Sequence, residues 1–73
     1  MAMIESLDEY AKLAQLADVA EEALGSMRFG SHFALNLELR KYGANTRTRE
    51  GDIKAARRIC DEFMMAYQIG AIA

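Results

Sequence analysis

Residues 6–24 carry a narrow stripe of polar side chains beside a wide apolar arc, and this pattern constrains the fold more than any other feature of the sequence. The stripe repeats at steps of three or four residues and consists of Asp8, Lys12, Gln15, Asp18 and Glu22. Ser6 followed by Glu9 forms a capping box, and Gly25 stands where a left-handed C-cap is expected. The pattern predicts a helix over residues 6–24, whose apolar arc is wide enough to pack against two partners.

A second amphipathic pattern covers residues 48–69. Its apolar positions also recur at steps of three or four residues and include Ile53, Ala56, Ile59, Cys60, Phe63 and Tyr67. Thr48 or Thr46 is suited to the N-cap, and Glu50 and Asp52 place acidic groups in the first turn, where the helix dipole favours them. We therefore expect a long helix over this segment.

Residues 31–42 allow two interpretations. Apolar and other side chains alternate from Phe33 to Arg40, which is the period of a half-buried strand. The residue types favour a helix, because Leu, Ala, Glu, Arg and Lys dominate and Val, Ile and Thr are missing. Ser31 as N-cap and Gly43 as C-cap bracket the segment at helical length. A helix would bury one apolar face and carry a second: Leu35, Leu39 and Tyr42 on the first, Phe33 and Leu37 on the second.

The helical interpretation predicts an all-α, three-helix domain over residues 1–73. Its helices would cover about 6–24, 31–42 and 48–69. The alternative is an α+β fold with a short strand or hairpin at about 27–40 between two helices. That alternative requires a partner strand, because a lone strand leaves its backbone hydrogen bonds unsatisfied.

The small size of the chain predicts association. A domain of 73 residues buries only about 60% of its unfolded surface and is marginally stable alone. One cysteine, Cys60, excludes an intramolecular disulfide, and one histidine, His32, falls short of a four-ligand zinc site. Hydrophobic residues make up 52% of the chain, which is more than so small a core needs. We expect a homodimer or small oligomer, with no cofactor and no bound metal.

Two further observations bear on location. No apolar run reaches the roughly 18 residues of a membrane span, and the N-terminus lacks the pattern of a signal peptide. The single cysteine is typical of a reducing compartment. We expect a soluble, cytoplasmic protein without membrane contact, located in the host cytoplasm if a phage encodes it.

Charge is unevenly distributed along the chain. Residues 1–24 contain six acidic side chains against one lysine, whereas residues 28–58 contain eight basic side chains against three acidic ones. The favoured interpretation is that the two halves neutralise each other, within one chain or between subunits, because the net charge is −2. The alternative is a basic patch over residues 47–58 that contacts nucleic acid, with Arg47, Arg49, Arg57 and Arg58 as its main contacts.

Met64 and Met65 are the remaining candidates for partner contact. They are adjacent on a helix whose Phe63 faces inward, so at least one of them must point away from the core. An exposed methionine suits an adaptable protein interface. Equally, these side chains could cover the side of the first helix.

Support for catalysis is thin. His32 and its neighbour Ser31 diverge by about 100° on a helix and cannot act on each other. Cys60 lies on the apolar face of the last helix, where a thiol behaves as a small hydrophobic group. We therefore expect no enzymatic activity and no catalytic residue.

Taken together, the sequence predicts a small non-enzymatic protein-binding module that acts as a homo-oligomer. Its build is that of the short helical inhibitors and adaptors carried by phages and mobile elements, an analogy that assigns no residue a role. The alternative is a nucleic-acid-binding regulator that uses the basic residues 47–58.

Overall fold

The protein consists of three α-helices in a computed structural model that describes residues 3–26, 30–44 and 46–70. The helices are α1 (Leu7–Glu22), α2 (Gly30–Arg40) and α3 (Arg49–Gln68). The prediction of an all-α, three-helix fold is confirmed, and the helix ends differ from the expected ones by one or two residues.

The strand alternative is wrong for residues 30–40, which form α2. Residues 27–29, the remaining part of the strand or hairpin predicted at about 27–40, lie outside the described residues. The alternating pattern consists of two pairs at i, i+4 spacing, and each pair occupies one face of a helix. Leu35 and Leu39 are fully buried, whereas Phe33 and Leu37 are 54% and 48% exposed. The alternation therefore reflects two helix faces rather than two faces of a sheet.

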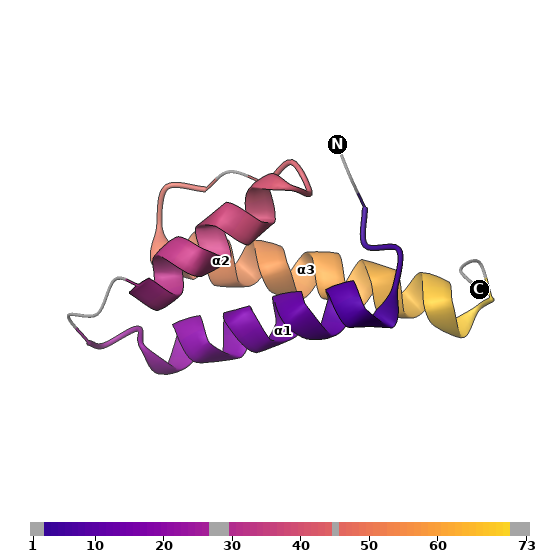
Figure 1. The fold of residues 1–73 in the computed structure, drawn as a ribbon, viewed down its shortest axis with the longest axis horizontal. Coiled ribbons are helices and arrows are strands. Elements are labelled where there is room, and N and C mark those ends of the chain that lie inside the picture. The colour runs from indigo at the N-terminus through magenta and orange to yellow at the C-terminus, as the bar shows by residue number, and fades with distance from the viewer. Residues whose placement is uncertain (1–2, 27–29, 45, 71–73) are drawn as a thin grey trace.

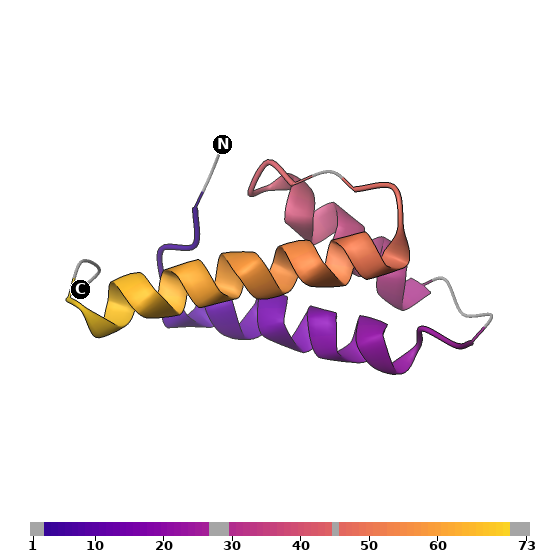
Figure 2. The same ribbon diagram turned by 180° about the vertical axis from the view of Figure 1, so that it is seen from behind.

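The helices pack side by side in an elongated molecule of 41 × 21 × 16 Å. The helix α3 runs antiparallel to α1, whereas α2 lies obliquely to both long helices, as the two opposite views show (Figures 1 and 2). The loop after α2 runs back along the molecule to reach the start of α3. At its C-terminal end α3 extends beyond both other helices.

The sequence determines several of the helix ends directly. The Ser6 hydroxyl accepts the Glu9 N–H at 3.2 Å and begins α1, and the Thr48 hydroxyl accepts the Gly51 N–H at 2.9 Å and begins α3. Gly43 has a φ of 77° and ends α2 as expected. The Gly43 and Ala44 N–H groups donate to the last carbonyls of that helix in a Schellman motif.

Two expected caps are wrong. The helix α1 ends at Glu22 with Ala23 as its C-cap, and among the described glycines only Gly43 and Gly70 have a positive φ, so Gly25 is no left-handed cap. The Ala23 carbonyl instead accepts the Ser26 hydroxyl at 3.0 Å, which satisfies the helix end without a left-handed residue. Ser31 lies inside α2, because this helix already begins at Gly30.

The core lies where all three helices meet. Each helix contributes one apolar face, and the fully buried side chains are Leu13, Ala17 and Ala20 of α1, Leu35 and Leu39 of α2, and Ala56 of α3. Small alanines on α1 and α3 allow the two long helices to approach closely. At one end of the pair, the ring of Phe63 stacks between Tyr10 and Tyr67 at centroid distances of 5.6 and 5.9 Å.

Candidate groove beside the C-terminal half of α3

The length of α2 leaves one end of the bundle uncovered. Its 11 residues span about 16 Å, whereas the 20 residues of α3 span about 30 Å, so α2 is long enough to cover only about half of α3. The segment before α1 covers part of this gap with Ile4, which is only 4% exposed. The remaining space is a groove open to solvent.

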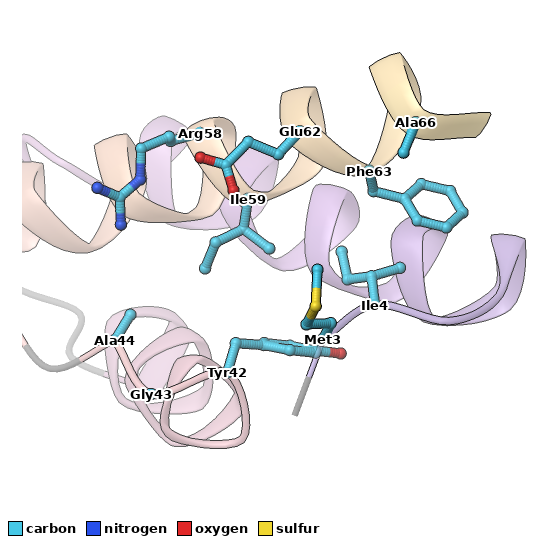
Figure 3. Close-up of a pocket in the computed structure, with 10 residues that line it drawn as sticks. All are labelled: Met3, Ile4, Tyr42, Gly43, Ala44, Arg58, Ile59, Glu62, Phe63 and Ala66. Atoms are coloured by element: carbon cyan, nitrogen blue, oxygen red, sulfur yellow. The ribbon is translucent and has the colours of Figure 1, made fainter. Parts of the chain in front are cut away.

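This groove has a volume of about 460 Å³ and is formed by three segments of the chain (Figure 3). Its lining comes from the segment before α1, from the turn after α2 and from α3: Met3 and Ile4; Tyr42, Gly43 and Ala44; Arg58, Ile59, Glu62, Phe63 and Ala66. Most of these side chains are apolar. Arg58 and Glu62 provide the charged groups, both on the α3 side (Figure 3). A largely apolar hollow with a few polar groups at its edge is typical of binding sites.

Tyr42 forms one wall of the groove and is anchored to α1. Its hydroxyl donates to Glu9 Oε2 at 3.5 Å. Burial in the core, together with the negative charges of Glu9 and Glu38, raises the pKa of Tyr42 to about 12, because burial and both carboxylates disfavour the phenolate. The phenol is therefore neutral at physiological pH and acts as a hydrogen-bond donor.

A buried acid holds the end of α2 in place beside this wall. Glu38 is 7% exposed, and its Oε1 lies 3.2 Å from Lys41 Nζ and 3.6 Å from Lys12 Nζ. Both lysine side chains are more than half exposed, so these ion pairs are screened by solvent and their main role is to satisfy the buried charge. The pair with Lys12 also fixes α2 against α1.

Four exposed residues follow one side of α3 from the groove to the C-cap of the helix, and we call them the α3 stripe: Arg58 and Glu62 of the groove lining, Met65, and the C-cap residue Ile69. They follow one another at steps of four, three and four residues, so they share one side of the helix. Met65 is 68% exposed and Ile69 81% exposed. The expectation that one of the two adjacent methionines points away from the core is confirmed, because Met65 is exposed while Met64 is half-buried.

The arginines expected to contact a partner do not lie on one surface. Arg57 points toward α1, where its Nη2 lies 2.6 Å from Asp18 Oδ1 and 2.9 Å from Glu21 Oε1. Arg49 is half-buried and donates to the Ser26 carbonyl at 3.3 Å. For Arg57, the favoured interpretation of intramolecular charge neutralisation is confirmed.

The other two arginines are exposed and lie in different places. Arg47 lies in the loop before α3, and Arg58 lies at the groove. The structure therefore brings Arg58 and Met65 together on the α3 stripe and separates them from Arg47, Arg49 and Arg57.

Sequence reasoning missed most of the groove. Ile4 and Tyr42 lie far apart along the chain, and nothing in the local pattern indicates that they line one hollow. One signal was present: the expected middle helix was much shorter than the third. A short helix packed against a long one must leave part of the longer helix uncovered.

The chemically reactive side chains are part of the core. Cys60 is 5% exposed, and burial raises the pKa of its thiol. His32 is 6% exposed, and neither ring nitrogen has a hydrogen-bond partner within the described ranges. In the same part of the chain, no group of three His, Cys, Asp or Glu side chains is arranged to hold a metal ion.

Comparisons with protein-family models, with curated proteins and with solved structures gave no match to this chain. Within the residues that the structure describes, none of the helices is both long and apolar enough to cross a membrane.

Proposed function

We propose that this protein is a non-enzymatic protein-binding module that uses the groove and the α3 stripe as its contact surface. The observation that carries the proposal is the 460 Å³ groove, whose apolar lining continues into two exposed apolar side chains, Met65 of α3 and Ile69 at the C-cap of this helix. Such a surface gains free energy when a partner removes it from water.

The chemistry of the groove suits the binding of a protein better than catalysis. Its charged groups are Arg58 and Glu62, both exposed at the edge, where they would form the polar rim that surrounds the apolar centre of many interfaces. The buried thiol and the buried imidazole lie outside the lining. We infer an inhibitor or adaptor in the cytoplasm, comparable in build to the small regulators of phages, that acts as a homo-oligomer.

A variant in the groove tests this function. Ala66 lines the groove and is half-buried, so Ala66→Glu places a charge in the apolar hollow. Val19 is 43% exposed on α1 and is not part of the lining, so Val19→Glu is the matched control. Each protein is immobilised and exposed to an extract of cells that also express the untagged protein, at low salt and at 1 M salt, where the Debye length is about 3 Å.

We expect the wild type and the control to retain the same protein or proteins at both salt concentrations, and Ala66→Glu to lose them. Circular dichroism establishes that all three proteins are folded. Retention of the same proteins by the folded Ala66→Glu variant would contradict the proposal.

The alternative function is nucleic-acid binding through residues 47–58. The exposed cations there are Arg47, Lys54 and Arg58, whereas Arg57 is engaged with two acidic side chains of α1. The alternative predicts an affinity that falls steeply with salt and is lost in Lys54→Glu. If single-stranded and duplex probes show no mobility shift at low salt, this alternative is excluded.

A further inference from the structure

The charges at the groove have no partner within the described part of the chain. Arg58 and Glu62 are both exposed and take part in none of the ion pairs that involve residues 3–26, 30–44 and 46–70. They are four residues apart on α3, with the base nearer the N-terminus, which is the less favourable order for an intrahelical pair. The α3 stripe therefore offers one free positive and one free negative group.

We propose that the occupant of the groove is a second copy of this chain, in a two-fold dimer formed by antiparallel α3 helices. The proposal rests on the proposed function and names its partner. In this dimer Arg58 of each copy pairs with Glu62 of the other, and Met65 of each copy enters the groove of the other.

Charge complementarity is the first argument for a second copy. A two-fold interface uses the same patch twice, so every contact between two different residues occurs in both directions. An antiparallel arrangement of the α3 stripe sets its positive group against the negative group of the other copy. The four unpaired charges of two chains thereby form two ion pairs in the dimer.

Helix geometry allows the charged and the apolar contacts at the same time. With the two-fold axis crossing α3 near residue 61, Arg58 and Glu62 of the second copy are offset by about 3 Å along the helix axis. Met65 and Ile59 of the second copy are offset by the same amount, about 3 Å. Arginine and methionine side chains are long enough to span such an offset, and Ile59 lies in the groove lining.

The second argument for a second copy is that it would bury the exposed apolar side chains of the α3 stripe. Met65 and Ile69 are among the most exposed large apolar side chains within the described residues. Met65 lies near the C-terminal end of α3 and Ile69 is the C-cap of this helix, and α2 does not cover this end of α3 (Figure 2). A second α3 would cover the open end of the bundle and add apolar burial that a domain of 73 residues lacks.

The proposal is tested by charge reversal and mixing. Sedimentation velocity over a series of concentrations gives the dimer dissociation constant of the wild type, of Arg58→Glu and of Glu62→Arg. Each single variant sets like charges against each other twice, so we expect its dissociation constant to rise about tenfold or more. An equimolar mixture of the two variants restores both opposite-charge pairs, and we expect a heterodimer close to wild-type affinity.

Matched controls separate this effect from changes in net charge. Arg47→Glu and Glu22→Arg make the same charge changes at exposed positions outside the stripe, and we expect both to dimerise like the wild type. Met65→Glu should abolish the dimer, whereas Val19→Glu should leave it intact. Circular dichroism identifies any variant that does not fold.

Several outcomes would overturn the dimer. These are a wild type that remains monomeric at every concentration, a dimer that Met65→Glu and the single charge variants leave unchanged, and a mixture that associates no better than its components. If the wild type is monomeric but captures other proteins that the Ala66→Glu variant does not capture, the dimer is rejected and the proposed function stands.

Discussion

Arg57 of α3 lies 2.6 Å from Asp18 of α1, and the same guanidinium nitrogen lies 2.9 Å from Glu21. This arrangement joins the basic and the acidic parts of the sequence within one chain. The Asp18 and Glu21 side chains are 63% and 59% exposed, and that of Arg57 is 39% exposed. Solvent therefore screens the interaction, and its contribution to stability is small.

Replacement of Arg57 tests whether this interaction contributes little to stability. We expect Arg57→Ala to lower the free energy of unfolding by about 1 kcal/mol or less at low salt, and by less at 1 M salt. Urea denaturation at both salt concentrations measures the difference. A loss that stays the same at 1 M salt would show that packing of the side chain, rather than charge, is responsible.

Asp52 is expected to contribute far more to the free energy of unfolding than Glu50, which lies in the same first turn of α3. Asp52 is 5% exposed and accepts hydrogen bonds from the Thr46 hydroxyl and from the Asn36 amide at 3.4 Å. Asp52→Ala removes the acceptor of the Asn36 side-chain amide and leaves the Thr46 hydroxyl with the Thr48 carbonyl at 3.1 Å as its acceptor, so it should cost about 2 kcal/mol. Glu50→Ala, at an exposed position, should cost about 0.5 kcal/mol or less. Equal losses in thermal denaturation would contradict the buried role of Asp52.

Replacing a glycine in a helix by alanine usually increases stability, but at Gly51 we expect the opposite. A Cβ atom at this position would lie 2.7 Å from the Thr48 Oγ1 that caps α3 and 3.1 Å from Thr46 Oγ1. We expect Gly51→Ala to displace the cap and lower stability by about 1 kcal/mol, in place of the usual gain of up to about 1 kcal/mol. Gly30→Ala is the control, because among the described residues no atom outside its chain neighbours and its own helix backbone lies within 4 Å of its Cβ position, and it should not lower stability. Chemical denaturation distinguishes the two variants.

Tyr42 should make the protein sensitive to high pH. Burial and the nearby carboxylates of Glu9 and Glu38 raise its pKa to about 12, above the value of about 10 in an unfolded chain. A group with a raised pKa contributes fully below the unfolded value, and its contribution is lost as the pH rises from about 10 toward 12.

We therefore expect the wild type to lose more stability than Tyr42→Phe between pH 10 and 12. Urea denaturation at several pH values measures both curves, and absorbance of the phenolate in the folded protein follows the titration of the tyrosines. Other groups that ionise in this range do so in both proteins, so the difference isolates Tyr42. Parallel curves would show that its phenol ionises as in the unfolded chain.

The sequence alone determined the helices, because their signals are local. Ser6, Thr48 and Gly43 act on backbone groups within a few residues of themselves, and burial at i, i+4 spacing distinguishes Leu35 and Leu39 from Phe33 and Leu37. The apolar periodicity thus predicts which face of each helix is buried, although the C-terminal end of α1 was predicted wrongly.

Only the tertiary structure decided what the charged residues do and where the groove lies. In the sequence Asp52 is an ordinary acidic residue of a first helical turn, and only the fold brings Asn36 of α2 within hydrogen-bond distance of it. Arg57 and Arg58 are neighbours in the sequence, but the rotation of 100° between successive helix positions points Arg57 toward α1. The groove depends on how far α2 extends along α3 and on where Ile4 docks. These are contacts between segments that are distant in the sequence, and the apolar periodicity of a single helix does not predict them.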